Sequence, residues 1–138
     1  MAYWLFKTEP EAWSWDQQKA KKGAEPWSGV RNHQAANNMK AMKKGELGFF
    51  YHSGDERRIM GIVTVAKEYH PDPTDETGRF GMVDVTYKDA FKTPITLAEI
   101  KADPRFKDMT LVKFSRLSVQ PVSAEHWKML CKMGGVRA

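Results

Sequence analysis

The sequence predicts an α+β fold in which a curled sheet or small barrel of five or six strands carries short helices. Two observations lead to this class. Segments rich in aromatic and β-branched residues recur along the 138-residue chain, and helix-capping signals stand between them. Strands with short helices inserted between them are typical of α+β folds and not of doubly wound sheets. Since no repeat or long linker divides the chain, we expect one domain over residues 1–138.

The N-terminal part is predicted to form a strand followed by two helices. Apolar and aromatic residues predict the first strand at Leu5 to Thr8. Ser14 opens an S-x-x-Q capping box, which starts a short helix that Gly23 can end. A second helix is expected from near Asn32 to Gly45. Its apolar face, at helical spacing, is formed by Ala35, Met39 and Met42.

The central part is predicted to contain three strands. The segments "ELGFFYH" and "RIMGIVTVAKEY" flank the turn "SGDE" and predict a hairpin. The polar segment "HPDPTDETGR", with two prolines, predicts a loop. In "FGMVDVTYKDAF" the residues Val83, Val85 and Tyr87 alternate with polar ones, as in a half-buried strand.

The C-terminal part is predicted to alternate helix, strand and helix. Thr96 opens a second capping box, "TLAE", and Asp103-Pro104 ends the helix that follows. The segment "LVKFSRLSVQPV" predicts one or two further strands. Ser123 is expected to cap a last helix with Gly134 beyond its end. Its apolar side carries Trp127, Leu130 and Cys131.

The sequence predicts a mildly basic surface and, because it shows no tail or partner domain and has one cysteine, a cytoplasmic monomer. The formal net charge is +5 and the pI is near 9.3. Residues 1–67 hold 11 Lys and Arg against 7 Asp and Glu, whereas residues 68–138 hold 11 against 10. Basic clusters such as "KAKK" and "KAMKK" could follow a phosphate backbone, although a solvated helix face explains each cluster alone. No secretory signal or membrane-spanning apolar run is expected, and the single cysteine excludes an internal disulfide.

Several kinds of chemistry lack their sequence signatures. Neither a phosphate-binding glycine loop nor a dinucleotide-binding motif is present. The four histidines are scattered without metal-ligand spacing, and Cys131 is expected to be a small core residue. No motif collects the carboxylates into a catalytic constellation, so we expect no metal, no cofactor and no enzyme activity.

The stretch "WSGVRNHQAANNM", residues 27–39, has too many polar groups for a core and too few charges for an ordinary exposed face. Trp27 lies in a loop, Gly29 permits close approach of a ligand, and Arg31 offers a planar set of donors. The free backbone N–H groups of a helix that starts here would bind carbonyl or phosphate oxygen. Gln34 and Asn37 both donate and accept hydrogen bonds one turn further on. Together these groups suit a flat, polar molecule such as a nucleobase.

A structural role is the competing interpretation for each of these residues. Trp27 could close one end of the core, Asn32 could simply cap the helix, and the remaining amides could be solvated. Other segments that could complete a pocket are the strand ends "FKTEP" and "FFYHS" and the predicted strand "FSRLSVQP". They contribute Lys7, Thr8, Tyr51, His52, Ser53, Arg116, Ser118 and Gln120, of which Arg116 and Gln120 are more simply explained by an exposed strand face.

With these residues identified, the chain resembles the EVE domain family of the PUA-like superfamily. The match runs nearly end to end through "WLFKTEP", "WSGVRNHQAANNM", "FFYHS", "YHPDP", "MVDV", "PITLAEIK" and "RLSVQPVS". The resemblance implies a PUA-like pseudo-barrel, kinship with the YTH domains, and recognition of nucleic acid that carries modified bases. Modified cytosine in DNA is the base that it favours.

The resemblance also assigns residues to a pocket that accepts a flipped base. It implies an aromatic wall at Trp27, a Lys-hydroxyl pair at Lys7 and Thr8, and a helix entrance that continues from Ser28. The residues implied at this entrance are Gly29, Val30, Arg31, Asn32, Gln34 and Asn37. His33 stands where the family often has tyrosine, and Ala36 stands where it often has a basic residue, which removes one expected phosphate contact. Tyr69 and His70 are candidates for a second aromatic wall.

The leading hypothesis is a non-catalytic reader in which a modified base of DNA or RNA stacks on Trp27 while Arg31 and the helix terminus bind its polar edge. On this hypothesis Trp27→Ala should remove binding and leave the fold intact. One alternative is an enzyme that acts on a modified base or nucleoside, which turnover would reveal. Another is a protein-interaction module, whose binding would be insensitive to salt.

Overall fold

The computed structural model describes residues 1–137 as a six-stranded sheet with five short α-helices. The strands are β1 (Tyr3–Thr8), β2 (Glu25–Pro26), β3 (Leu47–His52), β4 (Arg58–Pro71), β5 (Gly81–Thr96) and β6 (Val119–Val122). The helices are α1 (Trp15–Ala20), α2 (His33–Ala41), α3 (Leu97–Ala102), α4 (Thr110–Lys113) and α5 (Ala124–Gly134), with a 3₁₀ turn at Pro104–Phe106. This arrangement confirms the predicted α+β class.

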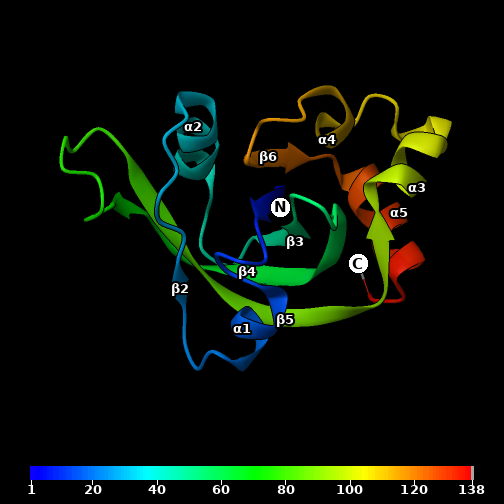
Figure 1. Cartoon of the computed structure of the whole chain (residues 1–138), viewed down its shortest axis with the longest axis horizontal. Coiled ribbons are helices and arrows are strands. Elements are labelled where there is room, and N and C mark those ends of the chain that lie inside the picture. The colour runs from blue at the N-terminus through cyan, green and yellow to red at the C-terminus, as the bar shows by residue number, and fades with distance from the viewer. Residues whose placement is uncertain (138) are drawn as a thin grey trace.

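The sheet has the order β2-β5-β4-β3-β1-β6, and its curvature comes from its two longest strands. β1 and β3 pair in parallel, and all other neighbours are antiparallel. The pairing of β4 with β5 changes register at four places, and such bulges bend a sheet and increase its twist. Figure 1 shows the long β4–β5 ribbon curving beneath the other strands, with α2 above one end and α3 and α5 toward the other.

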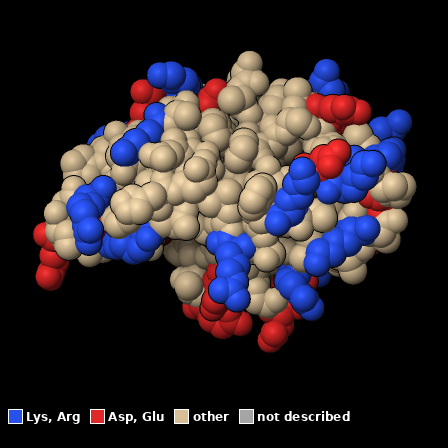
Figure 2. Space-filling view, turned by 90° about the horizontal axis from the view of Figure 1, so that it is seen from above, with Lys and Arg blue, Asp and Glu red and all other residues tan. Residues whose placement is uncertain are grey.

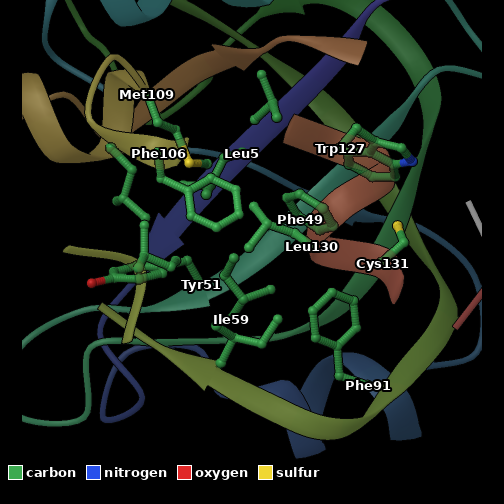
Figure 3. Close-up of a cluster of buried hydrophobic side chains, with 14 of the residues drawn as sticks. Leu5, Phe49, Tyr51, Ile59, Phe91, Phe106, Met109, Trp127, Leu130 and Cys131 are labelled. Carbon is green, nitrogen blue, oxygen red and sulfur yellow. The ribbon is translucent and has the colours of Figure 1, made fainter. Parts of the chain in front are cut away.

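Two hydrophobic clusters lie on the two faces of the central strands. Because successive side chains of a strand point to opposite faces, Leu5 enters one cluster and Phe6 the other. The first, called here the Trp127 cluster, is closed by α5, whose Trp127 ring stacks on Phe49 with centroids 4.0 Å apart. Figure 3 shows these side chains converging. The second, called here the Trp27 cluster, is closed by α2 and the loop before it.

The predicted capping residues are confirmed, although several element ends differ from the prediction. The side chains of Ser14, Asn32, Thr96 and Ser123 all accept a hydrogen bond from the first turn of their helices. The second helix nevertheless ends at Ala41, four residues before Gly45. The last helix includes Gly134, and Gly135 takes the left-handed conformation with φ 77° that ends it. No helix among residues 1–137 combines the length and the apolar character needed to cross a bilayer.

The prediction of strand throughout "LVKFSRLSVQPV" was wrong for its first half. Residues 110–113 form α4, and only Val119–Val122 form a strand. Leu111 is buried in the Trp127 cluster, so packing of this one turn overrides the preference of its β-branched residues for strand. Residues 114–118 form an irregular connection, in which the Leu117 amide donates to the Phe114 carbonyl at 3.2 Å. Arg116 therefore does not lie on a strand face with Gln120, and Gln120 is fully buried.

Candidate functional site

A cavity of about 370 Å³ opens beside the loop that precedes α2. Its volume lies within the range of pockets that bind small molecules. The end of β1, the segment before α1, β2 with the loop after it, and Ser118 just before β6 form its walls. These elements bring together seven of the residues expected at a base pocket, which are Lys7, Thr8, Trp27, Ser28, Gly29, Val30 and Arg31.

Trp27 forms a wall of this cavity and also belongs to the hydrophobic core. Its ring meets Phe6 and Phe50 edge to face, with centroids 5.2 and 5.7 Å away. Its backbone N–H donates to the Val83 carbonyl at 2.8 Å. Only 7% of the residue is exposed, and it lines the cavity. The two interpretations of Trp27, core residue and pocket wall, therefore both describe it.

Trp13 is the second tryptophan of the cavity, and it was not among the predicted site residues. The ring is half-buried, and its indole N–H donates to Gln18 Oε1 at 2.9 Å. The candidates for a second aromatic wall, Tyr69 and His70, line a different cavity of about 240 Å³ near Lys40 and Arg79. Trp13 could have been found by the argument applied to Trp27, because it too is a large ring placed outside a regular element.

Asp72 fixes the loop that carries Gly29 and Arg31. This carboxylate is buried and accepts hydrogen bonds from the Gly29 N–H at 2.8 Å and from the Arg31 guanidinium at 3.1 Å. It also accepts from the backbone N–H and the hydroxyl of Thr74, at 2.8 and 2.6 Å. Burial alone would raise the pKa of Asp72, but the hydrogen bonds from Thr74, Gly29 and Arg31 outweigh it and lower the pKa to about 2. The carboxylate is thus ionised at neutral pH.

The Arg31 guanidinium uses several of its donors within this loop, which leaves fewer of them for a ligand. Besides its bond to Asp72, the guanidinium donates to the Val30 carbonyl at 3.1 Å and to the Thr74 hydroxyl at 2.9 Å. The expected donor fork is therefore largely occupied within the protein, although Arg31 does line the cavity. Asp72 was not predicted, because a single sequence gives no signal for a contact across 41 residues.

The amides of α2 lie outside the cavity. The Asn32 side chain accepts from the Ala35 N–H at 2.8 Å, as an N-cap does, and Asn37 is exposed. Gln34 donates to Asn38 Oδ1 at 3.3 Å, and Asn38 in turn donates to the Val119 carbonyl at 2.8 Å. Asn38 thereby ties α2 to β6, and Asn32, Gln34 and Asn37 do not line the pocket.

Three further predicted site residues also lie away from the cavity. His52 is buried, with Nε2 accepting from the Trp15 N–H at 2.9 Å and Nδ1 lying 2.9 Å from Glu56. This pattern fits a ring that carries its proton on Nδ1 and serves a structural role. Ser53 lines another cavity, and Arg116 is exposed on the connection before β6.

The Lys7 and Thr8 side chains line the pocket with their polar atoms tied to neighbouring backbone. The Lys7 ammonium donates to the Ser115 carbonyl at 2.7 Å, and the Thr8 hydroxyl donates to the Trp13 carbonyl at 3.1 Å. Burial lowers the pKa of Lys7. An ammonium has three N–H donors, so Lys7 retains two for a ligand.

Comparison with known proteins gives the same family along nearly the whole chain. The family model of the EVE domain matches residues 2–133. Human thymocyte nuclear protein 1 is 33% identical over 96% of this chain and 73% of that protein. Its structure in complex with DNA containing 5-methylcytosine superposes with a TM-score of 0.92 at 32% identity, covering 100% of both chains. The NMR structure of a protein from Rhodopseudomonas palustris has a TM-score of 0.92 at 55% identity, covering 98% of this chain and 94% of that one.

A more distant likeness concerns the fold alone. The YTH domain of the Zygosaccharomyces rouxii MRB1 protein, solved with N6-methyladenosine RNA, has a TM-score of 0.59 at 16% identity. It covers 99% of this chain and 88% of that one. This structural similarity confirms the expected kinship in fold.

Proposed function

The chain belongs to the EVE domain family, and from this premise we propose that it binds nucleic acid carrying a modified base, without catalysing a reaction. We propose DNA that contains a methylated cytosine as the ligand, with the modified base flipped into the cavity between Trp13 and Trp27, called here the Trp13–Trp27 cavity. The observation that carries the proposal is this pair of tryptophans in one open cavity at the position of the family's motif. The DNA complex of human thymocyte nuclear protein 1 supports it.

The walls of the cavity suit a planar heterocycle. Two indoles offer apolar surface for stacking, which contributes about 1–3 kcal/mol per base. Hydroxyls of Thr8 and Ser118, the Lys7 ammonium and backbone of the loop at residues 28–30 stand around them and can bind the polar edge of the base. Extruding a base from a duplex costs a few kcal/mol, so stacking of this strength is needed to offset it.

Preference for a methylated base would come from apolar contact. One methyl group that fills apolar space is worth about 1–3 kcal/mol, or roughly 5–150-fold in affinity. The apolar part of the cavity is lined by Ala12, Trp13, Pro26, Trp27 and Val30. We therefore expect moderate discrimination rather than absolute selection.

The basic surface would add attraction for the phosphate backbone of either DNA or RNA. The net charge of +5 favours a polyanion. Figure 2 shows Lys and Arg side chains in groups toward both ends of the face seen from above Figure 1. This contribution carries no base information, so it would set affinity and the pocket would set preference.

Trp13→Ala tests the proposal with less damage to the core than Trp27→Ala, because the Trp13 ring is half-buried whereas Trp27 is buried. We expect a loss of about 1–3 kcal/mol of binding, or roughly 5–150-fold, toward oligonucleotides with 5-methylcytosine. Calorimetry against methylated and unmethylated DNA, single-stranded and duplex, and against the matching RNA measures it. Tyr69→Ala, in the other aromatic cavity, is the control and should bind like the wild type.

An affinity of Trp13→Ala equal to that of the wild type would refute the proposed pocket, provided that thermal unfolding shows both proteins folded. A changed mass of the oligonucleotide after incubation with the wild type would refute the absence of catalysis.

A further inference from the structure

A second cavity, of about 210 Å³, shares Lys7 with the Trp13–Trp27 cavity. It is called here the Lys7–Arg57 cavity. The turn between β3 and β4, the first helix after β5 and the connection before β6 enclose it. The polar residues of its lining are Lys7, Tyr51, Ser53, Arg57, Lys101 and Ser115.

The lining of this cavity is positively charged. It holds three cationic side chains, Lys7, Arg57 and Lys101, and none of its lining residues is Asp or Glu. Among residues 1–137, neither Arg57 nor Lys101 forms an ion pair within 4.0 Å. Like charges that converge without a counter-charge repel one another, so a bound anion would stabilise the arrangement.

The two carboxylates of the β3–β4 turn do not neutralise this cluster. Asp55 and Glu56 line a neighbouring cavity together with Arg57 and Lys101. Glu56 is engaged elsewhere, with Oε1 2.9 Å from His52 Nδ1 and 3.0 Å from Arg58. Asp55 is exposed at the turn and, among residues 1–137, forms no ion pair within 4.0 Å with a cationic side chain.

The backbone holds Arg57 in an uncommon conformation. Its φ is 45°, the one positive φ at a residue other than glycine in the described chain. Its carbonyl accepts the Leu97 N–H at 2.8 Å, which joins the β3–β4 turn to the start of α3. Arginine lacks the freedom of glycine in this region, and such conformations cluster at sites that bind ligands.

Two further groups supply neutral donors. Burial raises the pKa of Tyr51 to about 12 against the opposing charge of Arg57, so its hydroxyl keeps its proton. Ser53, which carries the second hydroxyl, also lines this cavity. Cations that surround neutral hydroxyl donors match a tetrahedral oxyanion better than a planar heterocycle.

We propose that the Lys7–Arg57 cavity binds a phosphate group, and that its occupant is a backbone phosphate of the strand whose base enters the Trp13–Trp27 cavity. Lys7 stands between the two cavities and can donate to either. The assignment to a nucleic-acid strand rests on the proposed function, whereas the binding of phosphate does not.

The phosphate part is tested with inorganic phosphate alone. In ¹H–¹⁵N NMR titrations the amides of Ser53, Gly54 and Arg57 should shift together and saturate. The shifts should be lost in the double variant Arg57→Gln/Lys101→Gln and kept in Lys128→Gln, which removes an exposed lysine from α5. Shifts that are absent, or that spread over the surface and persist in the double variant, would overturn the cavity as a phosphate site.

The strand part is tested through the salt dependence of binding to a single-stranded oligonucleotide with 5-methylcytosine. Each phosphate contact adds about 0.7 to the slope of log K against log salt. Arg57→Gln should lower the slope by about 0.7 and leave the preference for methylated over unmethylated DNA unchanged, and Lys128→Gln should change neither. A slope equal to the wild-type value would overturn the placement of the strand. If the wild type binds no nucleic acid, the proposed function fails and the phosphate titration still decides the cavity.

Discussion

Trp27 couples the stability of the protein to its pocket. Because 93% of the residue is covered and its ring packs on Phe6 and Phe50, Trp27→Ala should cost about 3–5 kcal/mol of unfolding free energy. Urea denaturation measures this loss, with Trp13→Ala as the milder comparison. The prediction from the sequence that Trp27→Ala leaves the fold intact is therefore replaced by the prediction of a large loss of stability. A loss below about 1 kcal/mol would contradict the packing described for this ring.

Asp72 makes the loop of Gly29 and Arg31 sensitive to acid. Its pKa is lowered to about 2 from an ordinary value near 3.8, so its ionised form stabilises the folded state. This contribution, about 2 kcal/mol, is present above roughly pH 4 and is lost as the pH falls through about 2. Asp72→Asn should remove that pH dependence and loosen the pocket rim. Asp108→Asn, at a carboxyl whose side chain is 72% exposed, should leave the dependence unchanged in urea unfolding from pH 2 to 7.

At the scale of elements, the bulge where β4 and β5 change register depends on Gly61. A Cβ added there would overlap the Trp15 ring and lie 2.6 Å from the Asp89 carbonyl. Gly61→Ala should therefore destabilise the fold by about 1–3 kcal/mol through overpacking. Gly78→Ala, in open space at φ 72°, should cost about 1 kcal/mol from its backbone alone. Equal melting temperatures of Gly61→Ala and the wild type would contradict this prediction. They would mean that the Trp15 ring and the β5 backbone move enough to accommodate the added methyl group.

Elements with local signals could be predicted from the sequence, and those that depend on distant contacts could not. Ser14, Asn32, Thr96 and Ser123 sit beside the backbone groups that they cap, so four helix starts were found. α4 has no side-chain cap and exists because Leu111 packs into a cluster formed by other elements. The two-residue strand β2 is likewise too short to leave a pattern.

The same division applies to the site. The residues of the Trp27 loop stand together in the sequence and could be selected together. Trp13 is distant from these residues in the sequence. It joins them because the segment between β1 and α1 lines the same cavity. Asp72 and the phosphate cavity depend on turns that the fold brings together from far along the chain. Their chemistry becomes visible only when distances are known.

At the scale of the whole molecule, a net charge of +5 should make binding to nucleic acid depend strongly on salt. Three phosphate contacts on a duplex would weaken binding by roughly 40-fold between 50 and 200 mM salt. Fluorescence anisotropy with a labelled duplex measures the slope, and the ratio of methylated to unmethylated affinity should stay constant along it. Affinity that is flat with salt would instead favour a peptide or another uncharged partner.

Lys7 lines both cavities with one ammonium group. A ligand bound in one cavity therefore changes the electrostatic potential in the other cavity. By thermodynamic reciprocity, each of the two ligands must change the affinity of the other by the same factor. Burial lowers the pKa of Lys7, and an anion bound in either cavity would raise that pKa. Binding of the anion at alkaline pH would therefore be accompanied by uptake of a proton. Binding of the base and binding of the backbone phosphate would then be coupled. A free nucleoside should therefore bind much more weakly than the same nucleoside within a strand.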